Sequence, residues 1–299
     1  MNFRVEKFMA YDLPEKENFV INSSIQGFAV SGRFAFNLFH GGLCAVYDLE
    51  KKSKAPVGVF RLASYNVGTP DQRYINHANQ AMFSDIYLEE GDEFPLLFVT
   101  TGNSGEADND GFIGRCAVER ITRAEIGFSS ELVQTIIYNN RDIENTRFES
   151  PCWGWPASFT DGKFYYIFSA RYRTTKAFRE FADRNAYIIT RFRLPDVSEK
   201  KVILTPDDIF DQFTAPFDIG FTQGGTLKDG KIYYLFGAGN ADYPDAMRVY
   251  DLGKREECGK FDLSATIMGG EEPECCAFYG ERLLFNTNTG NPKIYEIIM

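Results

Sequence analysis

The chain has 299 residues, of which 44% are hydrophobic and 25% charged, and these proportions exclude a disordered or collagen-like protein. Its formal net charge of −10 disfavours contact with phosphate backbones, so no nucleic acid partner is expected. No apolar run approaches the roughly 20 residues of a membrane-spanning helix, so no membrane partner is expected either. Aromatic residues reach 15%. Because aromatic side chains suit the half-buried surface of a sheet, this composition favours an all-β fold.

One pattern of strands recurs five times along the chain. Each copy has a short apolar strand, a tight turn with glycine, a second strand rich in Phe and Tyr, and then a third strand. The dipeptides Ser31-Gly32, Asp161-Gly162 and Asp229-Gly230 supply the positive φ angles of two-residue hairpin turns. In chain order the three strands are expected at 25–30, 34–36 and 44–49; 79–83, 95–100 and 115–121; 155–159, 164–168 and 186–194; 223–227, 232–236 and 247–252; and 274–278, 283–285 and 293–298.

Each copy also needs a fourth, outer strand. The candidates for the first four copies are 57–62, 132–138, 201–205 and 260–265. The last copy ends at Met299 without such a strand, and residues 3–11 could supply it from the other terminus. A ring of sheets closed in this way leaves no open edge between its first and last units.

Five copies of about 60 residues account for the whole chain, within the range of four to eight blades found in propellers. The sequence resembles the five-bladed β-propeller superfamily in this repeat architecture, although the WD dipeptide is absent. The resemblance implies one all-β propeller domain over residues 1–299, closed by an N-terminal strand in the last blade. A six-bladed ring is the alternative. Residues 174–184 are expected to form a helical insertion at the rim of the central funnel.

The N-terminal residues carry charges early and do not indicate a secretory signal, so we expect a cytoplasmic protein, or an exported one if a signal preceded residue 1. Six scattered cysteines form no CxxC pair, which argues against zinc. Cys44 and Cys116 lie in apolar strand patterns and are expected to be small buried side chains. No metal and no cofactor is expected, because no phosphate loop, dinucleotide fingerprint or calcium loop is present.

In a propeller, the loops that enter the first strands and those that join second to third strands open on one face of the ring. Amides, aromatic rings and histidine at these positions suit a carbohydrate, because rings stack and amides bind hydroxyl groups. The candidate ligand-binding residues are Gln26, His77, Asn79, Gln80, Trp153, Trp155, Arg171, Gln223, Asn240 and Asn286. A structural role is the alternative for each of them. The glutamines, for example, could bind the backbone of neighbouring blades.

The first functional hypothesis is a protein that binds a small polar ligand or carbohydrate in the central funnel without chemistry. The second is a glycoside hydrolase, a function found in several five-bladed propeller families, which requires two carboxyl groups about 5 Å apart for retention or about 6.5–9.5 Å for inversion. The candidate catalytic residues are Glu272 or Glu274, facing Glu149 or Asp218. Such enzymes usually have an acidic residue where this chain has Gln26, and this difference favours binding. A protein-interaction scaffold is the third hypothesis, and the sequence does not indicate the oligomeric state.

Overall fold

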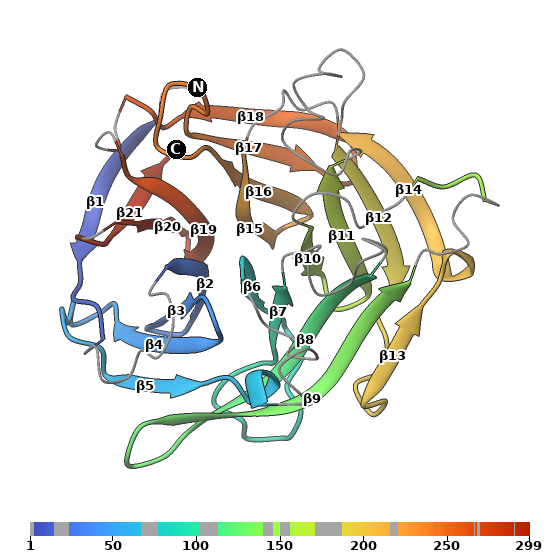
Figure 1. Cartoon of the computed structure of the whole chain (residues 1–299), viewed down its shortest axis with the longest axis horizontal. Helices are drawn as coiled ribbons and strands as arrows, with labels where there is room; N and C mark the ends of the chain where they lie inside the picture. The colour runs from blue at the N-terminus through green and yellow to red at the C-terminus, as the bar shows by residue number, and fades with distance from the viewer. Residues whose placement is uncertain are drawn as a thin grey trace.

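The computed structural model shows five antiparallel sheets arranged as the blades of a ring, a five-bladed β-propeller (Figure 1). The structure describes residues 3–14, 24–66, 77–101, 113–139, 146–149, 156–170, 187–215, 221–265, 267, 270–289 and 291–299. The predicted all-β fold and the number of blades are confirmed. The predicted helical insertion at 174–184 lies outside the described residues.

Each blade runs from an innermost strand beside the axis to an outer strand at the rim. Blade 1 consists of β2 (Ile25–Ser31), β3 (Phe34–Phe39), β4 (Leu43–Asp48) and β5 (Gly58–Arg61). Blade 2 consists of β6 (Gln80–Phe83), β7 (Leu97–Thr101), β8 (Ile113–Arg123) and β9 (Phe128–Asn139). Blade 3 consists of β10 (Ala157–Thr160), β11 (Phe164–Ala170), β12 (Tyr187–Arg193) and β14 (Ile209–Ala215). Blade 4 consists of β15 (Thr222–Lys228), β16 (Lys231–Phe236), β17 (Ala246–Asp251) and β18 (Glu256–Asp262). Blade 5 consists of β19 (Glu272–Tyr279), β20 (Arg282–Asn288), β21 (Lys293–Ile298) and β1 (Arg4–Ala10).

The turns between the first two strands of blades 1, 3 and 4 have the positive φ angles that the dipeptides Ser31-Gly32, Asp161-Gly162 and Asp229-Gly230 predict. Asp229 and Gly230 have φ angles of 49° and 70°, as a type I′ turn requires at both central positions. Gly32 and Gly162 also have positive φ angles, of 54° and 79°. These turns fix the register of the first two strands, and so determine which residues of each innermost strand face the axis.

The N-terminal strand closes the ring. β1 pairs antiparallel with β21, from Arg4 opposite Ile298 to Ala10 opposite Lys293, and it forms the outer strand of blade 5. The predicted closure by residues 3–11 is therefore confirmed. Phe8 and Met9 are buried by this pairing, and the first and last segments of the chain share one sheet.

The outer strand of blade 3 was predicted wrongly. Residues 201–205 do form a strand, β13 (Lys201–Leu204), but it pairs in parallel with β9 as a fifth strand of blade 2. The side-chain amide of Gln134 in β9 donates to the carbonyl oxygens of Asp196 and Glu199, at 2.6 and 2.8 Å, and holds the segment before β13 against blade 2. The outer position of blade 3 is taken instead by β14, which pairs antiparallel with β12.

The hydrophobic core lies between neighbouring blades. The ring centroids of Phe36 in blade 1 and Phe83 in blade 2 lie 5.0 Å apart, and those of Phe168 in blade 3 and Tyr234 in blade 4 lie 4.5 Å apart. The high aromatic content is explained by these joints, because wide rings fill the wedge-shaped space between twisted sheets. Cys44 and Cys116 are buried and not in disulfides, as predicted.

Helical structure in the described part of the chain is confined to two short 3-10 helices, η2 (Ala63–Asn66) and η5 (Pro206–Asp208). Within these described ranges, no helix is long and apolar enough to cross a membrane.

Candidate functional site

Three innermost strands among those described carry a β-bulge near the end at which they begin. One extra residue is accommodated between Ile25 and Phe28 in β2, between Thr222 and Gly225 in β15, and between Pro273 and Cys276 in β19. A bulge re-aims side chains and is common beside functional sites. The bulged dipeptides are Gln26-Gly27, Gln223-Gly224 and Glu274-Cys275, so each contains one predicted site residue.

Two other predicted site residues hold these bulges in place. The Gln80 side chain donates from Nε2 to the carbonyl oxygen of Gly225 at 2.7 Å and accepts from the Gly225 N–H at 2.6 Å through Oε1. Asn286 Oδ1 accepts from the N–H of Cys275 at 2.9 Å. Because a bulge removes ladder hydrogen bonds, these side chains satisfy backbone groups that would otherwise be buried without partners. Gln80 and Asn286 therefore stabilise the bulged backbone that carries Gln223 and Glu274.

A cavity of about 220 Å³ lies where the innermost strands begin, and we call it the axial pocket. Its walls come from blades 1, 2, 4 and 5, which the repeat brings together around the axis. The lining residues are Ser24, Gln26, His77, Asn79, Phe221, Thr222, Gln223, Glu272, Glu274 and Asn288. Six predicted site residues are among them, contributed by segments separated by up to about 250 residues of sequence.

Glu274 is the most deeply buried acid of the axial pocket. Its side chain is 3% exposed, and its Oε1 atom has no hydrogen-bond partner among the described residues. Burial raises the pKa of Glu274 well above its usual value, and the negative charge of Glu272 raises the pKa further. A hydrogen bond with Asn288 opposes these effects. Its surroundings therefore favour the protonated form of Glu274, which can both donate and accept a hydrogen bond.

Glu272 precedes Glu274 by two residues and is held by an amide. Gln223 Nε2 donates to Glu272 Oε1 and to the carbonyl oxygen of Gly237, both at 2.7 Å. The charge of Glu272 also acts on Asp245, although burial is the main cause that raises the pKa of Asp245 to about 6. The pocket thus contains two carboxyl groups in different surroundings: an amide donor binds Glu272, and burial favours the protonated form of Glu274.

The blade 2 wall of the pocket consists of His77 and Asn79. Asn79 is 6% exposed, and neither its Oδ1 nor its Nδ2 has a hydrogen-bond partner within the described ranges. The Nδ1 atoms of His77 and His40 lie 3.3 Å apart, so one ring donates to the other. Burial, together with the nearby His40, lowers the pKa of His77 to about 4. His77 is therefore uncharged at neutral pH, as the Asn79 amide always is.

The raised pKa of Glu274 makes stability depend on pH. Since the native state holds a proton that the unfolded chain releases above its ordinary pKa of about 4.5, wild-type stability falls as pH rises from that value towards the native pKa. The loss from this one group reaches at most about 1.4 kcal/mol per pH unit. Glu274→Gln keeps the shape of the neutral acid, so we expect the variant to gain stability relative to the wild type as pH rises above 4.5, as measured by denaturant unfolding. The exposed Glu90→Gln control should leave the profile unchanged, and parallel profiles for Glu274→Gln and wild type would contradict a protonated Glu274.

Other predicted site residues are not in the axial pocket. Glu149 lies beside the outer strand β14, where its backbone N–H and carbonyl oxygen bind the Gln212 side chain, each at 2.8 Å. Asn240 is exposed and binds the backbone of its own turn through Ala238 and Asp242. Trp153, Trp155, Arg171 and Asp218 lie outside the described residues.

Four lining residues were absent from the predicted site: Ser24, Phe221, Thr222 and Asn288. The first three lie within two residues of a predicted glutamine in β2 or β15, and Asn288 lies two residues after the predicted Asn286 in β20. The repeat therefore located these segments, while the extent of the pocket along each strand depends on the bulges. The feature of the sequence that best indicated the pocket was the shared repeat position of Gln26, Gln223 and Glu274.

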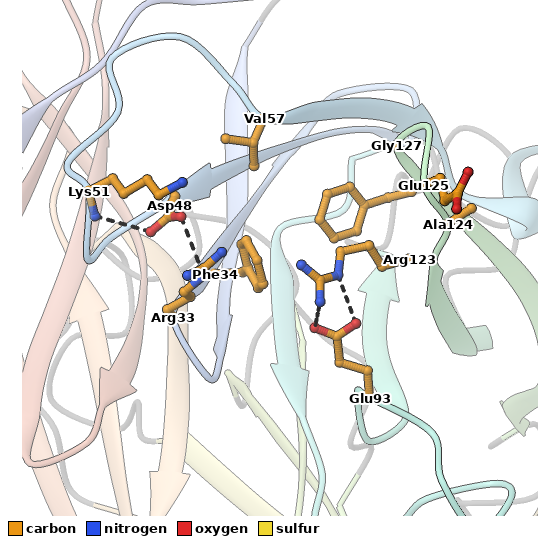
Figure 2. Close-up of a pocket in the computed structure, with 11 residues that line it drawn as sticks. Arg33, Phe34, Asp48, Lys51, Val57, Glu93, Arg123, Ala124, Glu125 and Gly127 are labelled. Carbon is orange, nitrogen blue, oxygen red and sulfur yellow. Dashed lines mark hydrogen bonds and ion pairs between the residues drawn. The ribbon is translucent and has the colours of Figure 1, made fainter.

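A second cavity, of about 530 Å³, lies between the first turn of blade 1 and the β8–β9 hairpin of blade 2 (Figure 2). Arg123 binds the Glu93 carboxylate at 2.7 and 2.8 Å, and Arg33 lies 3.4 Å from Asp48. Both guanidinium groups also lie about 5 Å from the Phe34 ring centroid, at 5.1 and 5.2 Å. Because the arginines already have carboxylate and aromatic partners, this cavity is a joint between blades, and the axial pocket is the better candidate site.

No known family model and no curated protein matches the sequence. Among solved structures, the chain is similar to the glutaminyl cyclase of Myxococcus xanthus, with a TM-score of 0.48 and 13% identity over 98% of this chain and 95% of that one. It is also similar to the tail fiber of Staphylococcus aureus phage P68, with a TM-score of 0.50 and 10% identity over 99% of this chain and 53% of that one. At these identities the similarity concerns the fold alone.

Proposed function

We propose that the axial pocket binds a small polar ligand of the carbohydrate class. The main support is that two side chains lining this pocket, Glu274 and Asn79, are nearly fully buried yet have polar atoms without partners among the described residues. A buried polar group without a partner costs about 1–3 kcal/mol. A ligand that supplies the missing partners recovers this free energy, which is how such a pocket gains affinity.

The polar groups without partners, the Glu274 carboxyl and the Asn79 amide, are matched better by hydroxyl groups than by anions. A protonated carboxyl and a carboxamide each both donate and accept, and a sugar hydroxyl does the same. Gln26, Gln223 and Asn288 add three further side-chain amides to the lining. The pocket volume of about 220 Å³ is below the 300–1,000 Å³ of sites for drug-sized ligands, which suits one sugar ring rather than a chain enclosed along its length.

Asn79→Ala tests this proposal, because it should separate binding from stability. Removal of an amide without partners is expected to leave the melting temperature unchanged or to raise it, while affinity for the bound sugar falls about tenfold. Titration calorimetry with a panel of neutral and amino monosaccharides measures the affinity, and thermal unfolding measures the melting temperature. Absence of binding across the panel, or unchanged affinity in Asn79→Ala, would contradict the proposal.

Glycoside cleavage is the second candidate, supported by the pair of acids in the pocket. Glu274 carries the proton that a general acid must donate, and Glu272 lies two residues away on the same strand. Aryl glycosides with a chromogenic leaving group test this candidate. Turnover that Glu274→Gln abolishes while binding persists would support cleavage, and no turnover by the wild type would leave binding as the function.

A further inference from the structure

We infer that the axial pocket selects sugars that carry a primary ammonium group, with Glu272 as the residue that recognises the charge. This inference rests on the proposed carbohydrate function and narrows it to amino sugars. It follows from the charges of the lining residues, from the partners of Glu272, and from the arrangement of the unmet polar groups around the same cavity.

The charge of the pocket is negative and has no cation to balance it within the described lining. The ten lining residues include Glu272 and Glu274 but neither lysine nor arginine. The neighbouring Lys293 is already engaged, since its Nζ binds Glu271, whose Oε2 also accepts from the Tyr295 hydroxyl at 2.7 Å. Lys293 and Glu271 therefore neutralise each other beside the pocket and do not cancel the charge of Glu272.

Glu272 supplies the negative charge that remains when Glu274 holds its proton. Its described partner is the neutral side-chain amide of Gln223, at 2.7 Å, which orients the carboxylate without neutralising it. The field of this carboxylate reaches two other acids, because it raises the pKa of both Glu274 and Asp245. An electrostatic field that favours protons on neighbouring acids favours a ligand cation in the same place.

The other walls of the pocket complete a site for an amino sugar. Asn79 from blade 2, with Oδ1 and Nδ2 unpartnered in the described structure, lies in the same lining as Glu272 from blade 5. A sugar ring whose ammonium binds Glu272 would present its hydroxyls to Asn79 and to the Glu274 carboxyl. His77 is neutral and adds no opposing positive charge. Sugar phosphates and uronic acids are disfavoured by the same carboxylate.

Three matched pairs of sugars test the inference with the chain of 299 residues: glucosamine and glucose, galactosamine and galactose, mannosamine and mannose. Titration calorimetry at pH 7 and low salt is expected to show, in at least one pair, that the amine binds about tenfold tighter or more, as charge-assisted hydrogen bonds require. In Glu272→Gln this preference should fall to threefold or less. The Glu90→Gln control should keep the wild-type preference.

The outcomes distinguish this inference from the function on which it rests. If neutral sugars bind as tightly as their amines, or if Glu272→Gln keeps the full preference, the ammonium inference is wrong and carbohydrate binding stands. If no sugar of any pair binds, the proposed function itself is wrong. Thermal unfolding of Glu272→Gln shows whether the variant is folded, and a second variant, Gln223→Leu, tests the same contact. It removes the amide that orients Glu272 and should also reduce the preference for amines.

Discussion

Replacing Gly224 with alanine is expected to destabilise the fold by about 2–4 kcal/mol, which lowers the melting temperature by roughly 5–10 °C. A Cβ atom at this position would lie 2.7 Å from the carbonyl oxygen of Asn79 and 2.7 Å from the Sγ of Cys275. The first contact is with backbone, and the second is with a thiol that is fully buried at the axis. Neither neighbour can move without displacing an innermost strand of another blade.

The physical reason is that the axis has room for few side chains. The bulges of β2, β15 and β19 place Gly27, Gly224 and Cys275 at equivalent positions, and the Cys275 side chain occupies space that Gly224 leaves free. Because Asn79 lines the axial pocket, Gly224→Ala should also weaken ligand binding. Gly253→Ala is the matched control: its added Cβ would come no closer than 3.4 Å to Asp251, and the residue has no positive φ. Equal melting temperatures for both variants would contradict this explanation.

Much of the fold could be predicted because each blade repeats the same local signals. Dipeptides such as Asp229-Gly230 fix hairpins, and the missing outer strand of the last copy pointed to the N-terminus. The error at residues 201–205 shows the limit of this reasoning. Both 201–204 and 209–215 form strands, and only contacts such as those of Gln134 decide which blade each one joins.

The candidate site was predictable in its location and less so in its details. Gln26, Gln223 and Glu274 were found because they share a repeat position, and this position lines the pocket. Gln80 also begins an innermost strand, but no register shift interrupts β6, and its side chain binds the backbone of Gly225 instead. The contact between His40 and His77 joins residues 37 apart in two blades, which no local pattern could indicate.

The arrangement of the site explains how one repeat provides both support and function. At equivalent places around the ring, some side chains satisfy bulged backbone and others face the cavity with unmet polar groups. The free energy of packing between blades keeps Glu274 and Asn79 buried without partners, although such groups are unfavourable for stability. For this reason we expect substitutions at Gly224 and at the closing strand to affect binding as well as folding.

Deleting residues 1–12 is expected to have the largest effect of any change considered, because it removes β1 and opens the ring. Phe8, Met9 and Tyr11 are all buried, and each contributes about 1.5–3 kcal/mol of burial, which together approaches the whole stability of a typical domain. The edge of β21 then becomes free to pair with other chains. We expect the variant to aggregate or to melt at least 10 °C lower, as measured by size-exclusion chromatography and thermal unfolding.

A peptide of residues 1–14 added in trans distinguishes loss of this strand from general misfolding. It carries the β1 sequence, the Tyr11 ring that packs 4.7 Å from Tyr47, and the Asp12 carbonyl that accepts from the Tyr47 hydroxyl at 2.8 Å. Because strand addition to an open edge restores the same hydrogen bonds, the peptide should recover a monomeric protein with a higher melting temperature. A peptide with Met9→Pro cannot donate at its centre and should rescue poorly. If the deletion variant were monomeric with the wild-type melting temperature, β1 would not be what holds the ring closed.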